Sequence, residues 1–144
     1  MSDIVKKDDG GLLEFLHSAN FKDLPRPFAV DIFLFETYVA GTRYIENIEL
    51  IEPMLNIDNK LVFYREPNNP YDENAIRIET INGDKIGYVP KKDNPVFSRL
   101  MDAGKNLYGI IKEKEKLDSW LKIDIEIYLY EGWEILIRRF VNDQ

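Results

Sequence analysis

The side chains best suited to chemistry lie together in the segment Pro67-Asn68-Asn69-Pro70-Tyr71-Asp72-Glu73-Asn74-Ala75. Its two prolines fix their own φ angles and keep the preceding residues extended, while asparagine and aspartate side chains bind nearby backbone groups. We therefore expect a rigid loop that presents an aromatic ring (Tyr71), a carboxylate (Asp72) and an amide (Asn74) at one fixed place. The structural alternative is a tight connection in which Asp72 and Asn74 only cap their own turn.

Signatures of enzymes are missing from the sequence. It contains no phosphate-binding loop ending in Gly-Lys-Ser/Thr, no Gly-x-Ser-x-Gly elbow, no cysteine and a single histidine, His17. The usual ligand sets for zinc therefore cannot be assembled, and we expect no nucleophilic triad. Paired carboxylates such as Asp72 and Glu73 could bind a divalent cation, but such pairs arise by chance among 26 acidic residues. We expect no catalytic site, no metal and no cofactor, and a metal-dependent nuclease is the least favoured alternative.

The charge balance restricts the partners of the protein. Lysine and arginine number 19 against 26 aspartates and glutamates, which gives a net charge of -7 and a pI near 4.8. General nucleic-acid binders are basic, so any binding to nucleic acid must use a local cluster of cations. The sequence has neither a signal-peptide pattern at its start nor an apolar run of about 18 residues. We therefore expect a cytoplasmic protein without a membrane partner.

The elements that must position the loop are mainly strands. Aromatic and β-branched residues bounded by turn signals predict six strands, at residues 31–40, 60–65, 75–80, 85–89, 107–116 and 120–130. The Asn82-Gly83 pair predicts a hairpin, and the alternation of apolar and polar residues in the last strand predicts a sheet with one wet face. One helix is expected from Asp93 or Asn94, as the cap, to Gly104. Because closure removes exposed sheet edges, we expect a small β-barrel.

The length of 144 residues fits a single domain with short additions at its ends. We expect residues 28–131 to form the barrel and residues 1–27 to form a short helical extension. Residues 132–144 are expected to form either a closing strand or a helical tail. Large aromatic side chains such as Trp120, Trp133 and Phe97 are expected in the core rather than at a binding site.

Three blocks of the sequence, in this order, resemble the HIRAN domain family. They are Val39-Ala40-Gly41-Thr42-Arg43-Tyr44, the proline-containing loop up to Ile76, and Asn82-Gly83-Asp84-Lys85-Ile86-Gly87-Tyr88-Val89-Pro90-Lys91. The resemblance runs from about Phe35 to Tyr130 and implies an OB-like β-barrel of about six strands with one inserted helix. It further implies a non-enzymatic module that binds single-stranded DNA at a free 3′ end. A partner helicase or nuclease would then be encoded separately.

The resemblance also implies which side chains touch DNA. Tyr44 and Tyr71 would hold the terminal base by stacking, and Asp72 would accept a hydrogen bond from the 3′-hydroxyl. One arginine and two lysines would contact phosphates, which positions a strand without reading its sequence. The complete set is Arg43, Tyr44, Tyr71, Asp72, Lys91 and Lys92. The structural alternatives are an ion pair with a glutamate for the arginine, packing at the core edge for the first tyrosine, and no role for the lysines.

Two features depart from the pattern of the family. Tyr88 stands where the vertebrate members have a histidine, and residues 45–59 form a longer segment that carries Glu46, Glu49 and Glu52. This acidic balance favours a second function of another class. In it, an OB-like module holds a protein segment, or acts as a scaffold, without binding DNA ends.

Overall fold

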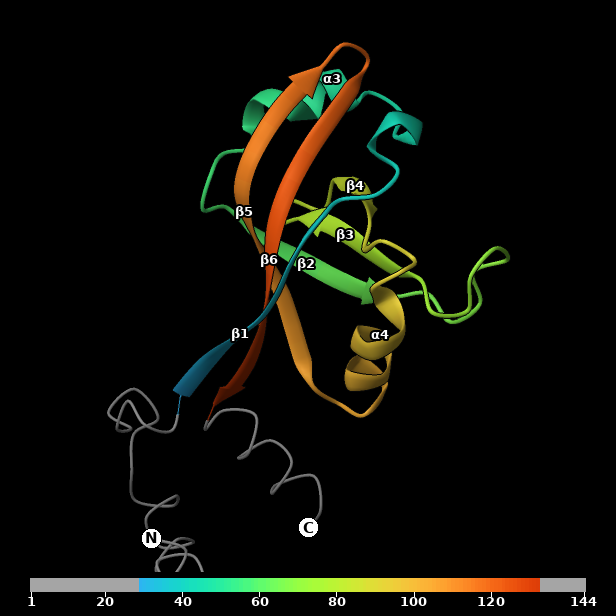
Figure 1. Cartoon of the computed structure of the whole chain (residues 1–144), viewed down its shortest axis with the longest axis vertical. Coiled ribbons are helices and arrows are strands. Elements are labelled where there is room, and N and C mark those ends of the chain that lie inside the picture. The colour runs from blue at the N-terminus through green and yellow to red at the C-terminus, as the bar shows by residue number, and fades with distance from the viewer. Residues whose placement is uncertain (1–28, 133–144) are drawn as a thin grey trace, which may run out of the picture. The chain divides into compact units, whose positions relative to one another are not determined.

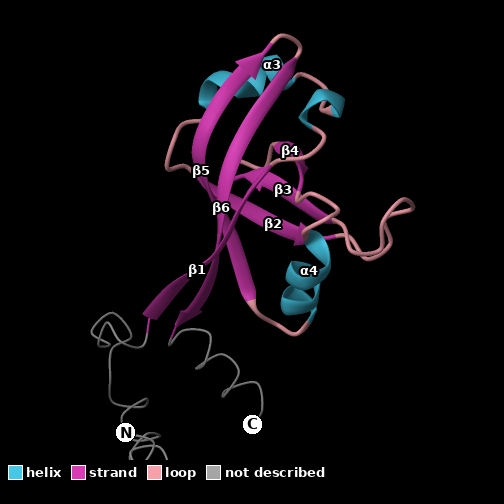
Figure 2. Ribbon diagram, viewed as in Figure 1, coloured by secondary structure: helices cyan, strands magenta, loops and turns pink. Residues whose placement is uncertain are grey.

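The computed structural model describes residues 29–132, which form a six-stranded antiparallel sheet and two short α-helices (Figures 1 and 2). The strands are β1 (Ala29–Tyr38), β2 (Lys60–Arg65), β3 (Ile76–Thr80), β4 (Lys85–Tyr88), β5 (Asn106–Leu117) and β6 (Trp120–Gly132). Their order in the sheet is β1-β6-β5-β2-β3-β4. The helices are α3 (Ile48–Ile51) and α4 (Asn94–Asp102), with 3-10 turns at η3 (Thr42–Tyr44) and η4 (Glu52–Met54). The expected fold class, mainly β with six strands, is confirmed.

Local turn chemistry accounts for the hairpin of β3 and β4. The two strands pair antiparallel with Arg77 opposite Tyr88. Between them, Gly83 has a φ of 91°, in the left-handed region that glycine adopts without strain. The backbone N–H of Thr80 donates to the carbonyl oxygen of Asp84 at 2.9 Å and closes the turn. The hairpin predicted from Asn82-Gly83 is therefore confirmed.

The core lies on the face of the sheet to which β6 contributes every second residue. Leu121, Ile123, Ile125 and Ile127 are buried, whereas the residues between them are half-buried. Each of these apolar side chains stabilises the fold by about 1.5–3 kcal/mol through its removal from water. Phe97 of α4 belongs to the same cluster of buried residues, so the expected helix packs an apolar face on this core.

Two backbone hydrogen bonds between one pair of residues join the two ends of the strand order. Ala40, which follows β1, donates its N–H to the carbonyl oxygen of Tyr88 in β4 at 2.8 Å and accepts from the N–H of Tyr88 at 2.9 Å. Gly87 permits this approach, because a Cβ at that position would lie 2.4 Å from the carbonyl oxygen of Ala40. The two segments therefore meet at one point, beside which the pocket described below opens.

The connection between β1 and β2 differs from the expectation. The sequence predicted one helix, which α4 confirms, but the structure adds α3 and η4 within residues 45–59. Ile48 and Ile51 pack against the core and Leu55 is fully buried. The apolar residues of this segment do not follow a clear helical or strand spacing, so packing on the core, and not the local pattern, determines its structure. The expected extension at residues 1–27 and the expected tail beyond Gly132 lie outside the described residues, as do His17 and Trp133.

Candidate nucleic-acid interface

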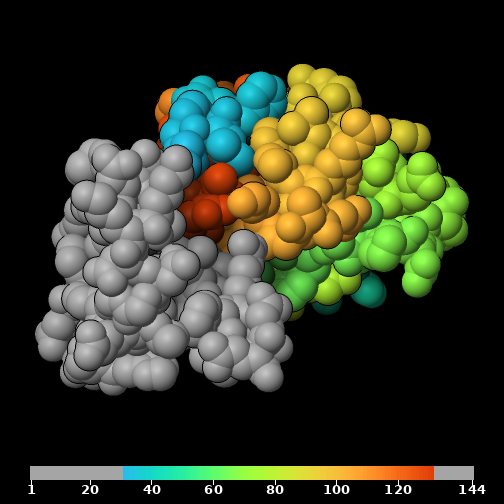
Figure 3. Space-filling view, turned by 90° about the horizontal axis from the view of Figure 1, so that it is seen from below, coloured from blue at the N-terminus to red at the C-terminus, as the bar shows by residue number. Residues whose placement is uncertain are grey.

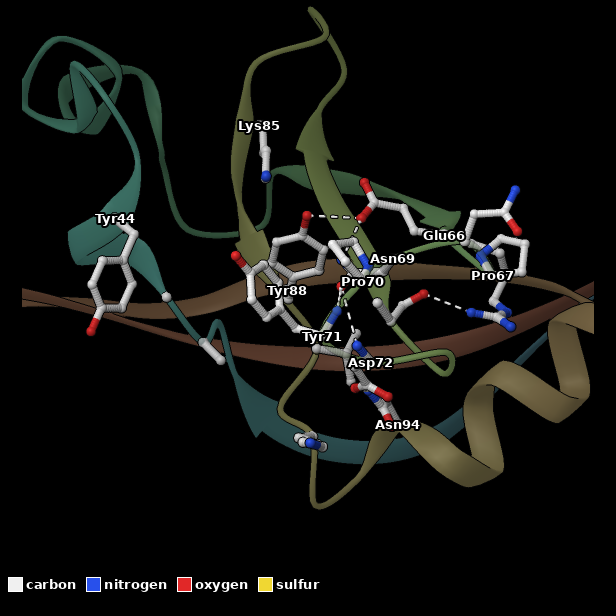
Figure 4. A pocket seen from close by; sticks show the side chains of 17 residues that line it. Tyr44, Glu66, Pro67, Asn69, Pro70, Tyr71, Asp72, Lys85, Tyr88 and Asn94 are labelled. Atoms are coloured by element: carbon white, nitrogen blue, oxygen red, sulfur yellow. Dashed lines mark hydrogen bonds between the residues drawn. The ribbon is translucent and has the colours of Figure 1, made fainter.

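A pocket of about 950 Å³ opens between the loop that follows β2, the end of β4 and the segment that follows β1 (Figure 4). The first turn of α4 completes its wall. The polar and aromatic residues of its lining include Tyr44, Arg65, Glu66, Asn69, Tyr71, Asp72, Lys85, Tyr88, Lys91 and Asn94. Segments far apart in the sequence thus bring rings, carboxylates and cations to one place.

Asn69 organises the tip of the loop. Its Oδ1 accepts hydrogen bonds from the backbone N–H groups of Tyr71 (2.9 Å) and Asp72 (3.2 Å), and its Nδ2 donates to Glu66 (2.9 Å). An asparagine side chain here replaces backbone partners that a strand or helix would supply. The loop is therefore held in one conformation, as its prolines and amides predicted.

Arg65, the last residue of β2, braces the base of the loop. Its guanidinium donates to the carbonyl oxygens of Glu73 (3.0 Å) and Ala75 (2.7 Å). It also forms a two-pronged contact with the carboxylate of Asp102, at 2.9 and 3.2 Å. In Figure 3, α4 and the start of β5 (yellow to orange) lie against the green surface of β2 and its following loop. The loop is thus fixed to the helix as well as to the strand.

Tyr44 and Tyr71 present their rings to solvent. Their exposed fractions are 83% and 87%, although both residues line the pocket. Tyr44 ends η3, which begins after Gly41 in a left-handed conformation (φ 80°), and Tyr71 projects from the loop tip. Tyr44 therefore does not pack at the core edge, and the rings of both tyrosines are accessible to a stacking partner.

Asp72 has both carboxylate oxygens in hydrogen bonds. Oδ1 accepts from the backbone N–H of Asn74 at 2.9 Å, and Oδ2 accepts from Nδ2 of Asn94 at 2.8 Å. Burial raises the pKa of Asp72, but these hydrogen bonds and the charges of Lys91 and Arg65 outweigh it, so the pKa lies below its ordinary value. The carboxylate caps its own turn, as the structural alternative stated. It also stays ionised, and each oxygen keeps a free lone pair.

Asn94 is a site residue whose role the sequence did not reveal. It is only 2% exposed, and its Oδ1 has no hydrogen-bond partner within residues 29–132. The sequence suggested Asp93 or Asn94 as a helix cap, and Asp93 does occupy the N-cap position of α4, but its side chain makes no capping hydrogen bond. Asp93 instead accepts from the hydroxyl of Thr37 at 2.8 Å, and Asn94 donates to Asp72. The Asn94-Pro95 pair at the helix start was the available signal in the sequence. It indicated a helix cap and not the hydrogen bond to Asp72.

The three cations expected at the site are separated by the fold. Lys91 lines the pocket beside Asp72. Lys92 lies 5.6 Å above the ring of Tyr38 and lines another depression. Arg43 lines a third, smaller one and forms no ion pair with any described residue, so the expected alternative of a glutamate partner is absent there. Four of the six expected residues therefore share the pocket, and Arg43 and Lys92 do not.

A second group of polar residues lies in and beside the pocket, and of these the sequence analysis had singled out only Tyr88. The hydroxyl of Tyr88 donates to Glu66 at 2.9 Å, and Arg77 forms an ion pair with Glu66 at 2.6 Å. Burial raises the pKa of Glu66, but hydrogen bonds from Asn69, Arg77 and Tyr88 outweigh it and hold the pKa below its ordinary value. Lys85 lies 4.5 Å above the ring of Tyr88. Nothing in the sequence had assigned a role to Glu66, Arg77 or Lys85.

The described residues contain neither a metal-binding cluster nor a helix suited to cross a membrane. Within residues 29–132, no group of three or more histidine, cysteine, aspartate or glutamate side chains is arranged to hold a metal ion. No helix in the same part of the chain is long and apolar enough to cross a membrane.

The HIRAN domain family matches residues 32–131 of the chain. Rabbit (Oryctolagus cuniculus) helicase-like transcription factor is 36% identical over 76 residues, which are 51% of this chain and 7% of that protein. A crystal structure of a Lactobacillus plantarum protein from a structural genomics consortium is similar with a TM-score of 0.68 and 28% identity. That likeness covers 72% of this chain and 99% of the other.

The HIRAN domain of human helicase-like transcription factor (HLTF) has a similar fold. Its crystal structure matches with a TM-score of 0.56 and 22% identity, over 78% of this chain and 88% of that chain. An NMR structure of the HLTF HIRAN domain in its DNA-bound conformation matches with a TM-score of 0.50 and 22% identity, over 78% and 87% of the two chains. That domain binds DNA. Since the family match runs from β1 to β6, through every element that builds the pocket, this chain belongs to the HIRAN domain family.

Proposed function

We propose that this chain is a non-enzymatic module that binds single-stranded DNA and captures a free 3′ end in the pocket beside the loop of residues 66–75. The observation that carries the proposal is the meeting of two exposed tyrosine rings and the ionised carboxylate of Asp72 in that pocket. Family membership and the DNA-bound structure of the HLTF domain support binding of DNA. The 3′ end is the finer part of the proposal, and it rests on the carboxylate.

Tyr44 and Tyr71 hold the last base or bases by stacking. An aromatic ring contributes about 1–3 kcal/mol per stacked base and accepts any base, because every base has a π-face. Both rings are more than four-fifths exposed and no other described ring stacks on them, so a base meets them without displacing a protein partner. The module therefore holds a strand without reading its sequence.

Asp72 tells a strand end from a strand interior. Its free lone pairs accept a hydrogen bond from a 3′-hydroxyl, whereas a phosphodiester at the same place has no proton to donate and carries a negative charge. The hydrogen bonds from Asn74 and Asn94 fix the orientation of the carboxylate and keep it ionised. Discrimination then comes from a single charge held in a fixed position.

Few cations attract the DNA backbone. Lys91 lies in the pocket, and Arg43 and Lys92, in neighbouring depressions, contact phosphates further along the strand. With a net charge of -7, the chain attracts DNA only locally. We further propose that it acts in the cytoplasm beside a separately encoded helicase or nuclease. The Ala40–Tyr88 contact supports an OB-like barrel as the scaffold.

Fluorescence anisotropy with a short oligothymidylate labelled at its 5′ end tests the proposal. The strand is prepared with either a 3′-hydroxyl or a 3′-phosphate, so only the end group differs. We expect the 3′-hydroxyl strand to bind more tightly, because the extra phosphate places its charge next to Asp72. Equal binding of both strands, or binding of neither, would refute end capture.

A second candidate, a protein-binding module, is favoured by one different observation. In residues 45–59, Leu50, Met54 and Ile57 are exposed, and every charged side chain there is acidic. Such a surface suits a basic, amphipathic protein segment. Unchanged anisotropy with every DNA strand, together with co-purification of a protein partner, would select this function.

A further inference from the structure

Three cations line the pocket, and they differ in the hydrogen bonds and ion pairs that they already form with the protein. Arg65 donates two hydrogen bonds to Asp102 and one to each of two backbone carbonyl oxygens, so the fold uses four of its five N–H donors. Lys85 and Lys91 form no ion pair with any residue in the described part of the chain. The pocket therefore offers two cations to a ligand, and of these the sequence indicated only Lys91.

The two lysines lie at different ends of the pocket. The charge of Lys91 lowers the pKa of Asp72, which places it at the carboxylate end. Lys85 extends from β4 with its Nζ 4.5 Å from the centre of the Tyr88 ring. Figure 4 shows the rings of Tyr71 and Tyr88 between Lys85 on one side and Asp72 on the other. A ligand that spans the rings meets a cation at either end.

Glu66 and Tyr88 explain why Lys85 keeps its charge available. The Glu66 carboxylate, which also lines the pocket, already accepts from Tyr88, Asn69 and Arg77. With Arg77 neutralising it, Glu66 forms no ion pair with Lys85. The hydroxyl proton of Tyr88 is already donated to Glu66, so it is not offered to a phosphate, and the ring lies beneath the ammonium group.

We propose that Lys85 binds the phosphodiester on the 5′ side of the terminal nucleotide, an inference that rests on the proposed function. A nucleotide carries its 3′-hydroxyl and its 5′-phosphate at opposite ends of the sugar. Since Asp72 takes the hydroxyl, the phosphate points away from that carboxylate and toward the far side of the pocket, where Lys85 lies. A lysine ammonium suits this contact because it is a compact charge with three donors that adapts to either phosphate oxygen.

The substitution Lys85→Ala tests the inference, with Lys60→Ala as a matched control. Lys60 also lies 4.5 Å above a tyrosine ring, that of Tyr108, but it does not line the pocket. Both variants lose one positive charge and one cation–π contact, so only the location differs. Each is titrated with the 3′-hydroxyl and 3′-phosphate oligothymidylates at several salt concentrations, and thermal denaturation checks that both are folded.

The salt dependence supplies the decisive number. For single strands, log K falls by about 0.7 per phosphate contact for each tenfold rise in salt. A fourfold rise in salt then weakens binding about 2.6-fold for each phosphate contact. We expect the same rise in salt to weaken binding of the wild type and of Lys60→Ala by the same factor, and binding of Lys85→Ala by a factor about 2.6-fold smaller, because that variant has one contact fewer. Lys85→Ala should also bind more weakly overall while keeping the preference for the 3′-hydroxyl.

The titrations distinguish a failure of the role of Lys85 from a failure of 3′-end capture. If Lys85→Ala behaves like Lys60→Ala while the wild type still prefers the 3′-hydroxyl, the role of Lys85 is refuted and end capture stands. If the wild type binds neither strand, or both equally, the proposed function fails and this inference fails with it.

Discussion

The hydrogen bond between Asn94 and Asp72 gives a quantitative prediction. Asn94 is 2% exposed, and its Nδ2 donates to the ionised carboxylate at 2.8 Å. The substitution Asn94→Ala removes this donor and leaves the carboxylate with the backbone N–H of Asn74. Because the lost hydrogen bond is to a charged group, we expect the free energy of unfolding to fall by about 1.5–3 kcal/mol at neutral pH. The Oδ1 of Asn94 has no described partner, so its removal adds little.

The same substitution has a defined pH dependence. The pKa of Asp72 in the folded protein lies below its ordinary value, and the hydrogen bond from Asn94 is foremost among the causes that lower it. Stability from a carboxylate with a depressed pKa is complete above the unfolded-state pKa, about 3.9, and is lost as pH falls through the folded-state pKa. The difference in the free energy of unfolding between the wild type and Asn94→Ala should therefore shrink as the pH falls through the folded-state pKa of Asp72. Below it, we expect a difference of about 0.5–1.5 kcal/mol, the range for a neutral hydrogen bond.

Urea denaturation at a series of pH values measures this difference directly. Other carboxylates with lowered pKa values, such as Glu66 and Asp102, are present in both proteins, so their contributions cancel. Asn59→Ala is the control, since the Oδ1 of Asn59 accepts a neutral backbone hydrogen bond, from Asn56, at an exposed position. A loss that is equally large at neutral and acidic pH would show that Asn94 stabilises the fold by packing, and the reasoning on Asp72 would be wrong.

Three further predictions concern single side chains. Tyr71→Ala should weaken DNA binding by about 1–3 kcal/mol in anisotropy titrations, through the loss of one stacking ring. Tyr64→Ala is the control, because Tyr64 lies outside the pocket and its loss should leave binding unchanged. Equal losses of binding free energy in the two variants would show that Tyr71 does not contact DNA. Asp72→Ala should abolish the preference for a 3′-hydroxyl over a 3′-phosphate in the same assay, and a retained preference would show that another group reads the end. Gly87→Ala should lower the midpoint of thermal unfolding, because the new Cβ would lie 2.4 Å from the carbonyl oxygen of Ala40. An unchanged midpoint would mean that the backbone at Ala40 can move away from β4 without a loss of stability.

The fold was predictable where local patterns are strong. The alternation of residues 120–130 and the Asn82-Gly83 turn predicted a strand and a hairpin that the structure confirms, because side-chain period and left-handed turn conformations are properties of short segments. The elements α3 and η4 were missed, since burial against distant residues shapes them. The contact of Ala40 with Tyr88 was equally out of reach, as it joins segments that only the whole sheet brings together.

The site divides in the same way. The sequence by itself determined the rigid loop, and with it Tyr71 and Asp72, because prolines and short amide side chains act on their own neighbours. The tertiary structure decided which cations join them. Lys91 and Lys92 are adjacent in the chain but line different depressions, and Lys85, which sequence analysis passed over, lies in the pocket. Where a side chain points after the sheet has formed is a property of the assembled strands, and no short stretch of sequence contains it.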